Sequence, residues 1–437
     1  MNYRNEVDWS PREARRAERS SILSSCCTSM GDVPFTDAAI IILYANMLGA
    51  SESFTMVTTA LLPLTVGFCA IPASRRVMSG KSYQQTVLNA TMFALLMFGT
   101  IVAAPFFGRY AVVVLLGALA LFSLGHTVYI AAWFPMIDTF VTQERRSLYL
   151  GKMRFSWQLA AALLLLAISA VIGKNPPIGK LQLVMLFSMF VYAFKLYFIG
   201  RIPRFRIKNR ETFNFREGLA MALANKPLAG YSVYLFILNL AAYGTIPLTT
   251  LYMKKALNAP DNVIVLISSI VLTGMLIGSF FAGRIIQRCG IRRTFLGVHV
   301  SYALVNLALF FMGRSLIPGD LLYYLIGGIL FLYSFTFACA NISSSSEMMA
   351  LATPGNKVMA MAFCNSFYYG GQGLSRLMAS LILGSGALAS SWMLNGIVVT
   401  HYQTLFLVYA VCIVFAASLL VVVPAIFPKG EYVYAIH

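Results

Sequence analysis

Charged residues are scarce in this chain: they make up 11% of its 437 residues, and only 15 of them are Asp or Glu. Soluble domains contain about 25% charged residues, so an ordinary soluble protein is excluded. The sequence has no glycine-rich phosphate-binding loop, which argues against ATP hydrolysis. Its seven cysteines and four histidines show no metal-ligand spacing. We therefore expect neither a metal nor a cofactor.

The sequence also supports neither a cleavable signal peptide nor nucleic-acid binding. No cleavable signal peptide is expected, because a polar stretch from Arg4 to Arg19 precedes the first apolar run. The net charge of +18 could indicate nucleic-acid binding, but the basic residues lie in short loops and form no continuous basic face. We expect no nucleic-acid partner.

Apolar residues dominate instead, at 59% of the chain, and they recur in stretches of about 20 residues, the length of a transmembrane helix. We predict an all-α polytopic membrane protein with twelve spans in two pseudo-symmetric six-helix bundles. The spans are placed at 27–48, 54–74, 85–107, 110–137, 155–173, 181–202, 228–252, 262–283, 294–312, 321–344, 358–383 and 403–428.

These spans divide the chain into five parts: a tail (1–26), a first bundle (27–203), a linker (204–227), a second bundle (228–428) and a short tail (429–437). Within the linker, residues 213–224 are predicted to form an amphipathic helix on the inner membrane surface.

The loops between the spans are alternately rich and poor in Lys and Arg. We place 25 of the 33 basic residues on one side. Two, Lys195 and Arg376, fall within spans. Basic loops stay in the cytoplasm, so both termini are predicted to be cytoplasmic in a multi-pass protein of the inner (plasma) membrane. The basic residues on the opposite side are Arg109, Lys174, Lys180, Lys254, Lys255 and Arg314.

This topology makes a direct prediction. Cysteines introduced at Lys180 and Lys254 should react with a membrane-impermeant thiol reagent applied to intact cells, because both positions lie in predicted outer loops. A cysteine at Arg210, in the predicted inner linker, should not react. Labelling at Arg210 would rule out the twelve-span arrangement.

The loop between the eighth and ninth spans reads Gly283-Arg-Ile-Ile-Gln-Arg-Cys-Gly290-Ile-Arg-Arg293. It resembles the signature inner loop of the major facilitator superfamily, although Gln287 stands where that family has an acid. Gly283 is expected to allow close helix approach and Gly290 a turn with positive φ. The resemblance implies a monomeric secondary transporter whose two bundles enclose a central cavity and open it alternately to each side.

The subfamily is less defined. Residues 215–228 and 251–255 are similar to the middle of cation-coupled sugar symporters, but the second span lacks the acids those proteins carry. The expected cargo is a small polar solute, with a sugar or a small organic anion favoured. Coupling to a proton is expected, with a sodium ion as the alternative.

Ionisable residues within spans are costly and mark candidate functional sites. Asp37, near the bilayer midplane, and Asp32, deeper towards the inside, are the candidate proton carriers, since desolvation disfavours a charged carboxylate. On a continuous helix they would point about 140° apart. His126 lies at the depth of Asp32 and could contact it. Lys195 is expected to extend its ammonium to the inner surface.

Arg376, in the eleventh span, is a candidate anchor for a polar or anionic solute because its guanidinium pairs well with carboxylates. Amide and phenol side chains in the same and neighbouring spans are candidates to bind the solute by stacking and hydrogen bonding; ordinary helix packing would explain them equally. These residues are Gln372, Tyr369, Asn365, Asn239, Tyr243, Tyr333 and Asn341.

An inner gate is also predicted. Asp138 and Glu347 end the fourth helix of each half, close to basic loops. Each acid is expected to pair with the bases of its own half when the cavity opens outward and to release them when it opens inward. The bases are Arg75 and Arg76 in the first half and Arg284 and Arg288, beside Gly283 and Gly290, in the second.

Two other classes of function remain as alternatives. A polytopic enzyme acting on lipid or isoprenoid would need paired acids at the membrane surface, and Asp138, Glu144 and Glu347 form no convincing pair. A non-transporting sensor on the same scaffold would be expected to carry a larger soluble domain.

Overall fold

The structure, a computed structural model, describes residues 10–79, 82–141, 143–202, 215–352 and 356–422. The last predicted tail and much of the linker lie outside this part of the chain. The described residues are almost entirely helical, in agreement with the predicted all-α class.

In the described residues of the first half there are seven α-helices and one 3-10 helix: α1 (Pro11–Thr36), α2 (Ala38–Met47), α3 (Glu52–Ser79), α4 (Tyr83–Ala103), η1 (Ala104–Tyr110), α5 (Ala111–Asp138), α6 (Gln143–Ile172) and α7 (Ile178–Gly200). The first helix begins at Pro11 instead of Cys27, so it includes much of the predicted tail. Its start is stabilised by Ser10, which accepts a hydrogen bond from the backbone N–H of Glu13.

The second half comprises α8 (Phe215–Ala224), α9 (Lys226–Ala242), α10 (Thr245–Lys255), α11 (Asp261–Phe311), α12 (Leu321–Leu351), α13 (Lys357–Ser385), β1 (Ser391–Leu394), β2 (Ile397–Thr400) and α14 (His401–Val422). The short α8 lies within residues 213–224, where a linker helix was predicted, and its place on the inner membrane surface stays a prediction. The antiparallel hairpin of β1 and β2 was not predicted; it occupies the loop before the last helix.

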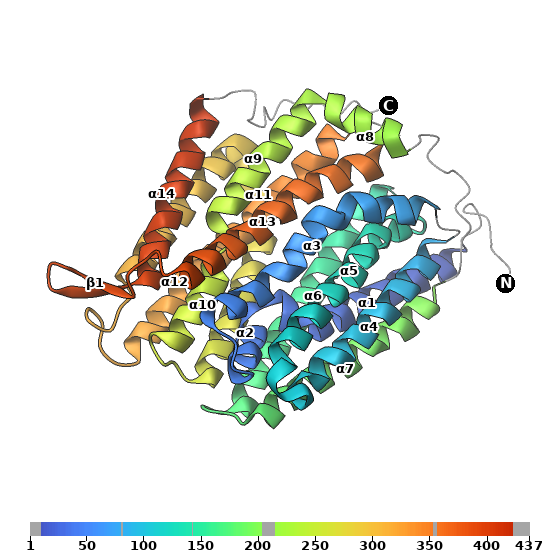
Figure 1. Cartoon of the computed structure of the whole chain (residues 1–437). Coiled ribbons are helices and arrows are strands. Elements are labelled where there is room, and N and C mark those ends of the chain that lie inside the picture. The colour runs from blue at the N-terminus through green and yellow to red at the C-terminus, as the bar shows by residue number, and fades with distance from the viewer. Residues whose placement is uncertain (1–9, 80–81, 142, 203–214, 353–355, 423–437) are drawn as a thin grey trace.

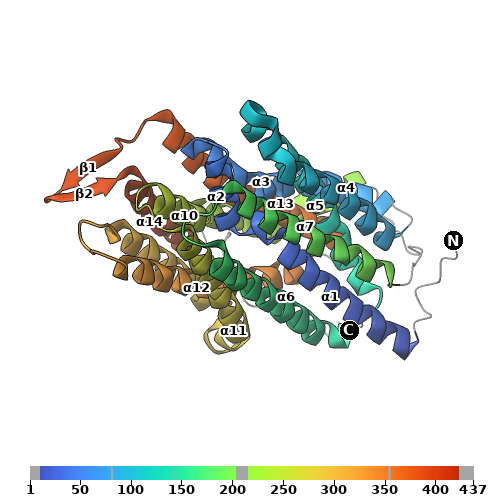
Figure 2. The same cartoon turned by 90° about the horizontal axis from the view of Figure 1, so that it is seen from below.

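The long helices run side by side, so the molecule has two ends (Figure 1). We call one the α8 end, where α8 and the start of α1 lie, and the other the hairpin end, where β1 and β2 lie. Figure 2 shows the helices of the first half gathered to one side and α10, α11, α12 and α14 to the other. The α8 end is the side predicted to be cytoplasmic.

Eight helical segments of the described chain are long and apolar enough to cross a membrane, or nine if the bent pair α1 and α2 is one span. Two of these, Tyr83–Ile137 and Asp261–Phe311, have 55 and 51 residues and contain a glycine of positive φ near the middle, Gly108 and Gly290. The polytopic membrane fold is therefore confirmed, and the count of twelve remains a prediction.

The first predicted span is broken, which corrects the expectation of a continuous helix. Helix α1 ends at Thr36, and α2 leaves it at an angle of 47°. Asp37 forms the junction: its carboxylate accepts a hydrogen bond from the N–H of Ala39, 3.0 Å away, and so caps α2. The predicted angle of 140° between Asp32 and Asp37 assumed one straight helix and does not apply.

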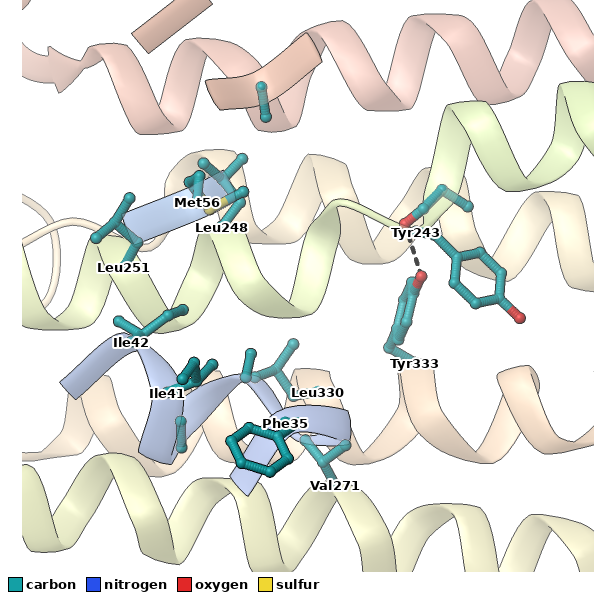
Figure 3. Packing of buried hydrophobic residues seen from close by; sticks show 14 of the residues in the cluster. Phe35, Ile41, Ile42, Met56, Tyr243, Leu248, Leu251, Val271, Leu330 and Tyr333 are labelled. Atoms are coloured by element: carbon teal, nitrogen blue, oxygen red, sulfur yellow. Dashed lines mark hydrogen bonds between the residues drawn. The ribbon is translucent and has the colours of Figure 1, made fainter. Parts of the chain in front are cut away.

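The two halves meet along α3 with α13 and along α6 with α11. At the hairpin end, Ile42 of α2 also points towards Leu251 of α10, and Met56 of α3 lies beside Leu248 (Figure 3). Hydrogen bonds join the halves at the same end: the hydroxyls of Ser53 and Ser380 are 2.9 Å apart, and His401 Nε2 lies 3.2 Å from Glu52 Oε2.

Helices α3 and α13 are in close contact at Gly67 and Gly370, so a larger side chain at this point should destabilise the protein. A Cβ added at Gly67 would lie 2.6 Å from the Cα of Gly370. Gly67→Ala should therefore push the halves apart at a cost of about 1–3 kcal/mol. Thermal unfolding of the purified protein should show a clear loss of stability. Gly117→Ala, with nothing within 4 Å of the new Cβ, is the matched control. Equal melting temperatures for both variants would contradict the close contact.

Candidate functional site

A cluster of ionisable residues is buried inside the first half. Asp32 of α1 is 5% exposed, and its Oδ2 lies 3.8 Å from Nδ1 of His126 on α5. The structure thus brings these two predicted coupling residues together, although the separation exceeds hydrogen-bonding distance. Rings surround them: His126 stacks on Phe122 and lies beside Tyr129.

Lys195 of α7 completes this cluster, and the expectation that it extends to the surface is wrong. Its side chain is fully buried, with Nζ 3.8 Å from the ring centroids of both Tyr129 and Tyr192. The ammonium also interacts electrostatically with Asp32. A cation between two aromatic faces is stabilised by their quadrupoles, by about 2 kcal/mol when it is desolvated.

The sequence contained a signal for the position of Lys195. Along α7 it shares a face with Ser188, Tyr192 and Ile199, all of which are buried. The large apolar residues of the opposite face, such as Phe190, are exposed. The helical period therefore places Lys195 on the packed face.

Asp37 lies apart from that cluster, at the contact between the halves. Besides Ala39, it neighbours Ser268 of α11 and Arg376 of α13 in the other half. Arg376 Nη1 donates to the carbonyl oxygen of Thr59 at 2.7 Å, and its Nε donates to that of Tyr243 at 3.4 Å.

Proline explains why these two carbonyls are free to accept. In an α-helix the carbonyl of residue i bonds to the N–H of residue i+4. Pro63 stands four residues after Thr59, and Pro247 stands four residues after Tyr243, and proline has no N–H. Arg376 thus donates a hydrogen bond to one carbonyl in each half. It lies near Asp37 at the break between α1 and α2 and contacts Tyr243 at the break between α9 and α10.

The predicted tyrosines and one amide of the second half are largely packed. Tyr333 donates to the carbonyl of Ala242 at 2.7 Å beside the α9–α10 break (Figure 3). The hydroxyls of Tyr243 and Tyr368 are 2.6 Å apart. Asn239 is 1% exposed and donates to Leu235 within its own helix. These contacts fix α9, α12 and α13 relative to one another.

The remaining solute-binding candidates are less enclosed. Asn365 and Tyr369 are partly exposed on α13, and Gln372, one turn further, is buried beside Tyr368. Asn341 of α12 is partly exposed and accepts from the Ser345 hydroxyl at 3.4 Å.

Arg154 of α6 was not among the residues predicted from the sequence. It comes from the first half, yet it faces the phenols of Tyr368 and Tyr369 on α13 of the second. No acidic side chain in the described part of the chain neighbours it.

The predicted gate residues lie at the α8 end but are not all brought together. Glu347 is 2% exposed, inside α12 and not at its end, and it neighbours Tyr231. Arg284 lies over Phe280 of its own helix, 5.1 Å from the ring centroid, and Arg288 is exposed. The side chain of Asp138 lies outside the described residues.

The basic loops give a mixed result. Arg75 and Arg76 are exposed at the end of α3, and Arg75 lies 5.9 Å from the ring centroid of Phe215 in α8. Gly290 has a φ of 76°, as expected for the turn. Gly283 does not mediate close helix approach: nothing lies within 4 Å of a Cβ placed there, so that prediction was wrong.

Comparison with known proteins agrees with this architecture. The sequence model of the Major Facilitator Superfamily matches residues 21–376. No curated protein matches the chain significantly. Among solved structures, the nucleoside transporter NupG is similar, with 13% identity, a TM-score of 0.65 and coverage of 94% of this chain and 98% of that one.

Two other structures show the same fold. A POT family transporter in complex with 5-aminolevulinic acid has 12% identity and a TM-score of 0.70, covering 96% of this chain and 97% of that one. An inward-facing bacterial homologue of the iron transporter ferroportin has 15% identity and a TM-score of 0.61, covering 95% and 99%. The chain therefore belongs to the Major Facilitator Superfamily and is a membrane transporter rather than an enzyme.

Proposed function

We propose that this transporter is a proton-coupled symporter of a small polar solute and that Asp32 carries the proton. The observation that supports this is the buried cluster itself. Asp32 shares an apolar interior with a histidine and a lysine, an arrangement that is expensive in a membrane protein and therefore marks function. Asp37, the other candidate, caps α2 and faces Arg376 of the other half, which favours a role in joining the halves.

The cargo follows from the charges at the contact between the halves. The similar structures transport or bind nucleosides, 5-aminolevulinic acid and iron, so the fold alone selects no cargo. Of the two predicted classes, Arg154 favours a small organic anion over a sugar, because its guanidinium faces phenols and no described acid. The partly exposed Asn365 and Tyr369 lie on the same helix as those phenols and would bind polar groups of the solute.

We further propose that the protein acts as a monomer in the inner (plasma) membrane, with both termini in the cytoplasm. The asymmetric distribution of Lys and Arg between loops supports this orientation. In this arrangement α8 and the basic loops face the cytoplasm and the hairpin faces outward.

Purified protein in liposomes containing a pH-sensitive dye provides the test. External lactate, gluconate, succinate, glucose and xylose are added one at a time, with the membrane potential clamped. We expect at least one of the acids to acidify the lumen, and this acidification should disappear with a protonophore. Uptake of radiolabelled solute that is unaffected by the protonophore and by the pH gradient would refute proton coupling. Uptake restricted to the sugars would refute the assignment of an anionic cargo.

A further inference from the structure

Three buried polar groups lie around Asp32 and form no hydrogen bonds with one another. In the described part of the chain, Lys195 Nζ, His126 Nδ1 and the hydroxyl of Tyr192 have no hydrogen-bond partner. Buried polar atoms in native proteins are nearly always hydrogen-bonded, so three unsatisfied groups around one carboxylate indicate a site whose bonding changes during function.

The backbone forces these groups together. A Cβ added at Gly31 would lie 2.5 Å from the Cβ of Tyr192, so α1 and α7 are in close contact at this level. Asp32 follows Gly31 directly, and Lys195 lies about one turn beyond Tyr192 on the same face of α7. The packing of Gly31 therefore brings Lys195 to the level of Asp32, where the two groups interact electrostatically, and the ammonium stays buried between two rings.

We propose that Lys195 is the positioning residue that sets the proton affinity of Asp32, so that the two side chains act as one neutral unit between transport events. This inference rests on the proposed role of Asp32. The proton adds to a carboxylate oxygen of Asp32, while Lys195 keeps its three protons. The loaded cluster then carries one net positive charge in an apolar interior.

The surroundings of Asp32 support this balance of charges. The titratable groups that face the pair are His126 and Tyr129 from α5, Tyr192 from α7 and Cys27 from α1. In their neutral forms these four groups add no charge to the pair. One acid is thus set against one base. An opposite charge nearby favours the ionised carboxylate, so Lys195 offsets the effect of burial on Asp32.

The loaded state also explains a preference for anionic cargo. Burying a net charge is costly unless a counter-ion is present. A solute anion that enters as the proton binds would offset the positive charge of the cluster, so that proton and anion are favoured together.

The test requires no knowledge of the cargo. Infrared difference spectra of the full-length protein in lipid nanodiscs, recorded over a series of pH steps, report the carbonyl band of a protonated carboxyl group. We expect a band in the wild type that is missing in Asp32→Asn. In Lys195→Met the band should persist to a higher pH, with its midpoint raised by at least one unit, a tenfold gain in proton affinity. Lys180→Met, at the other end of the same helix, is the matched control and should leave the midpoint unchanged.

Stability provides the second measurement. Asp32→Asn and Lys195→Met should each lower the melting temperature, because each leaves one buried charge unpaired, and the double variant should recover much of the loss. Should Lys195→Met not fold, Lys195→Gln serves the same purpose. An unchanged midpoint in a folded Lys195 variant, or the absence of any titrating Asp32 band, would overturn the proposal. A shifted midpoint combined with normal accumulation by Asp32→Asn would instead retain the pair and refute proton coupling.

Discussion

Asp32→Asn should abolish accumulation of the solute against its gradient while leaving exchange of internal for external solute largely intact. The asparagine is permanently neutral, so the carrier can still reorient but cannot draw on the proton gradient. The site is 5% exposed, with His126 3.8 Å away and Lys195 packed between two rings. Uptake and exchange in the same liposomes would separate the two effects.

Two variants serve as controls for this result. Asp37→Asn should retain pH-driven accumulation if Asp37 only caps α2 and faces Arg376. Asp261→Asn alters an ion pair with Lys254 at the hairpin end and should also retain it. Normal pH-driven accumulation in both Asp32→Asn and Asp37→Asn would remove carboxylate coupling in the first span from consideration.

Arg376→Gln should separate the two halves at the hairpin end and reduce transport at least tenfold. The guanidinium bridges carbonyls freed by Pro63 and Pro247, and a glutamine amide cannot replace a charged donor at both. Hydrogen bonds from charged groups contribute about 1.5–3 kcal/mol each, and about 1.4 kcal/mol is a factor of ten in an equilibrium. Spin labels at the exposed positions Phe106 and Leu321 should show longer distances than in the wild type.

The same experiment distinguishes this role from the solute-anchoring role expected from the sequence. If Arg376 binds the solute, Arg376→Gln should weaken solute affinity without changing the label distances. Arg376→Lys keeps the charge but replaces the planar guanidinium by an ammonium that cannot donate to both carbonyls in the same geometry. If Arg376 joins the halves, Arg376→Lys should therefore recover the wild-type label distances only in part. Lys180→Gln, a charge change at the same end, should alter neither measurement.

The membrane class, the positions of most helices and the family could all be predicted from the amino-acid sequence. These features depend on local properties: a run of about 20 apolar residues has to be helical in lipid because its backbone has no other hydrogen-bond partners. The basic loop around Gly290 likewise carries its own conformation, a positive φ that glycine adopts without strain.

The broken helices depend on a combination of local and distant residues. Pro34 and Pro247 weaken the first and seventh spans, but a proline also fits inside unbroken helices, as Pro63 does in α3. Asp37 can cap α2 in the membrane because Arg376 and Ser268 approach it from the other half. A pattern within one span contains no information about such partners.

Which ionisable residues meet could be learned only from the packing of the helices. Lys195 and Asp32 are far apart along the chain, and Arg154 and Tyr368 lie in different halves, so no spacing in the sequence relates them. The predicted position of Lys195 near the inner end of its span was compatible with a side chain that reaches the membrane surface. In the structure α1 and α7 are in close contact at Gly31 and Tyr192, and the Lys195 side chain is buried between the helices. Charged residues within the spans identified the candidates, whereas helix packing selected their partners, because two side chains interact only where the backbones bring them to the same place.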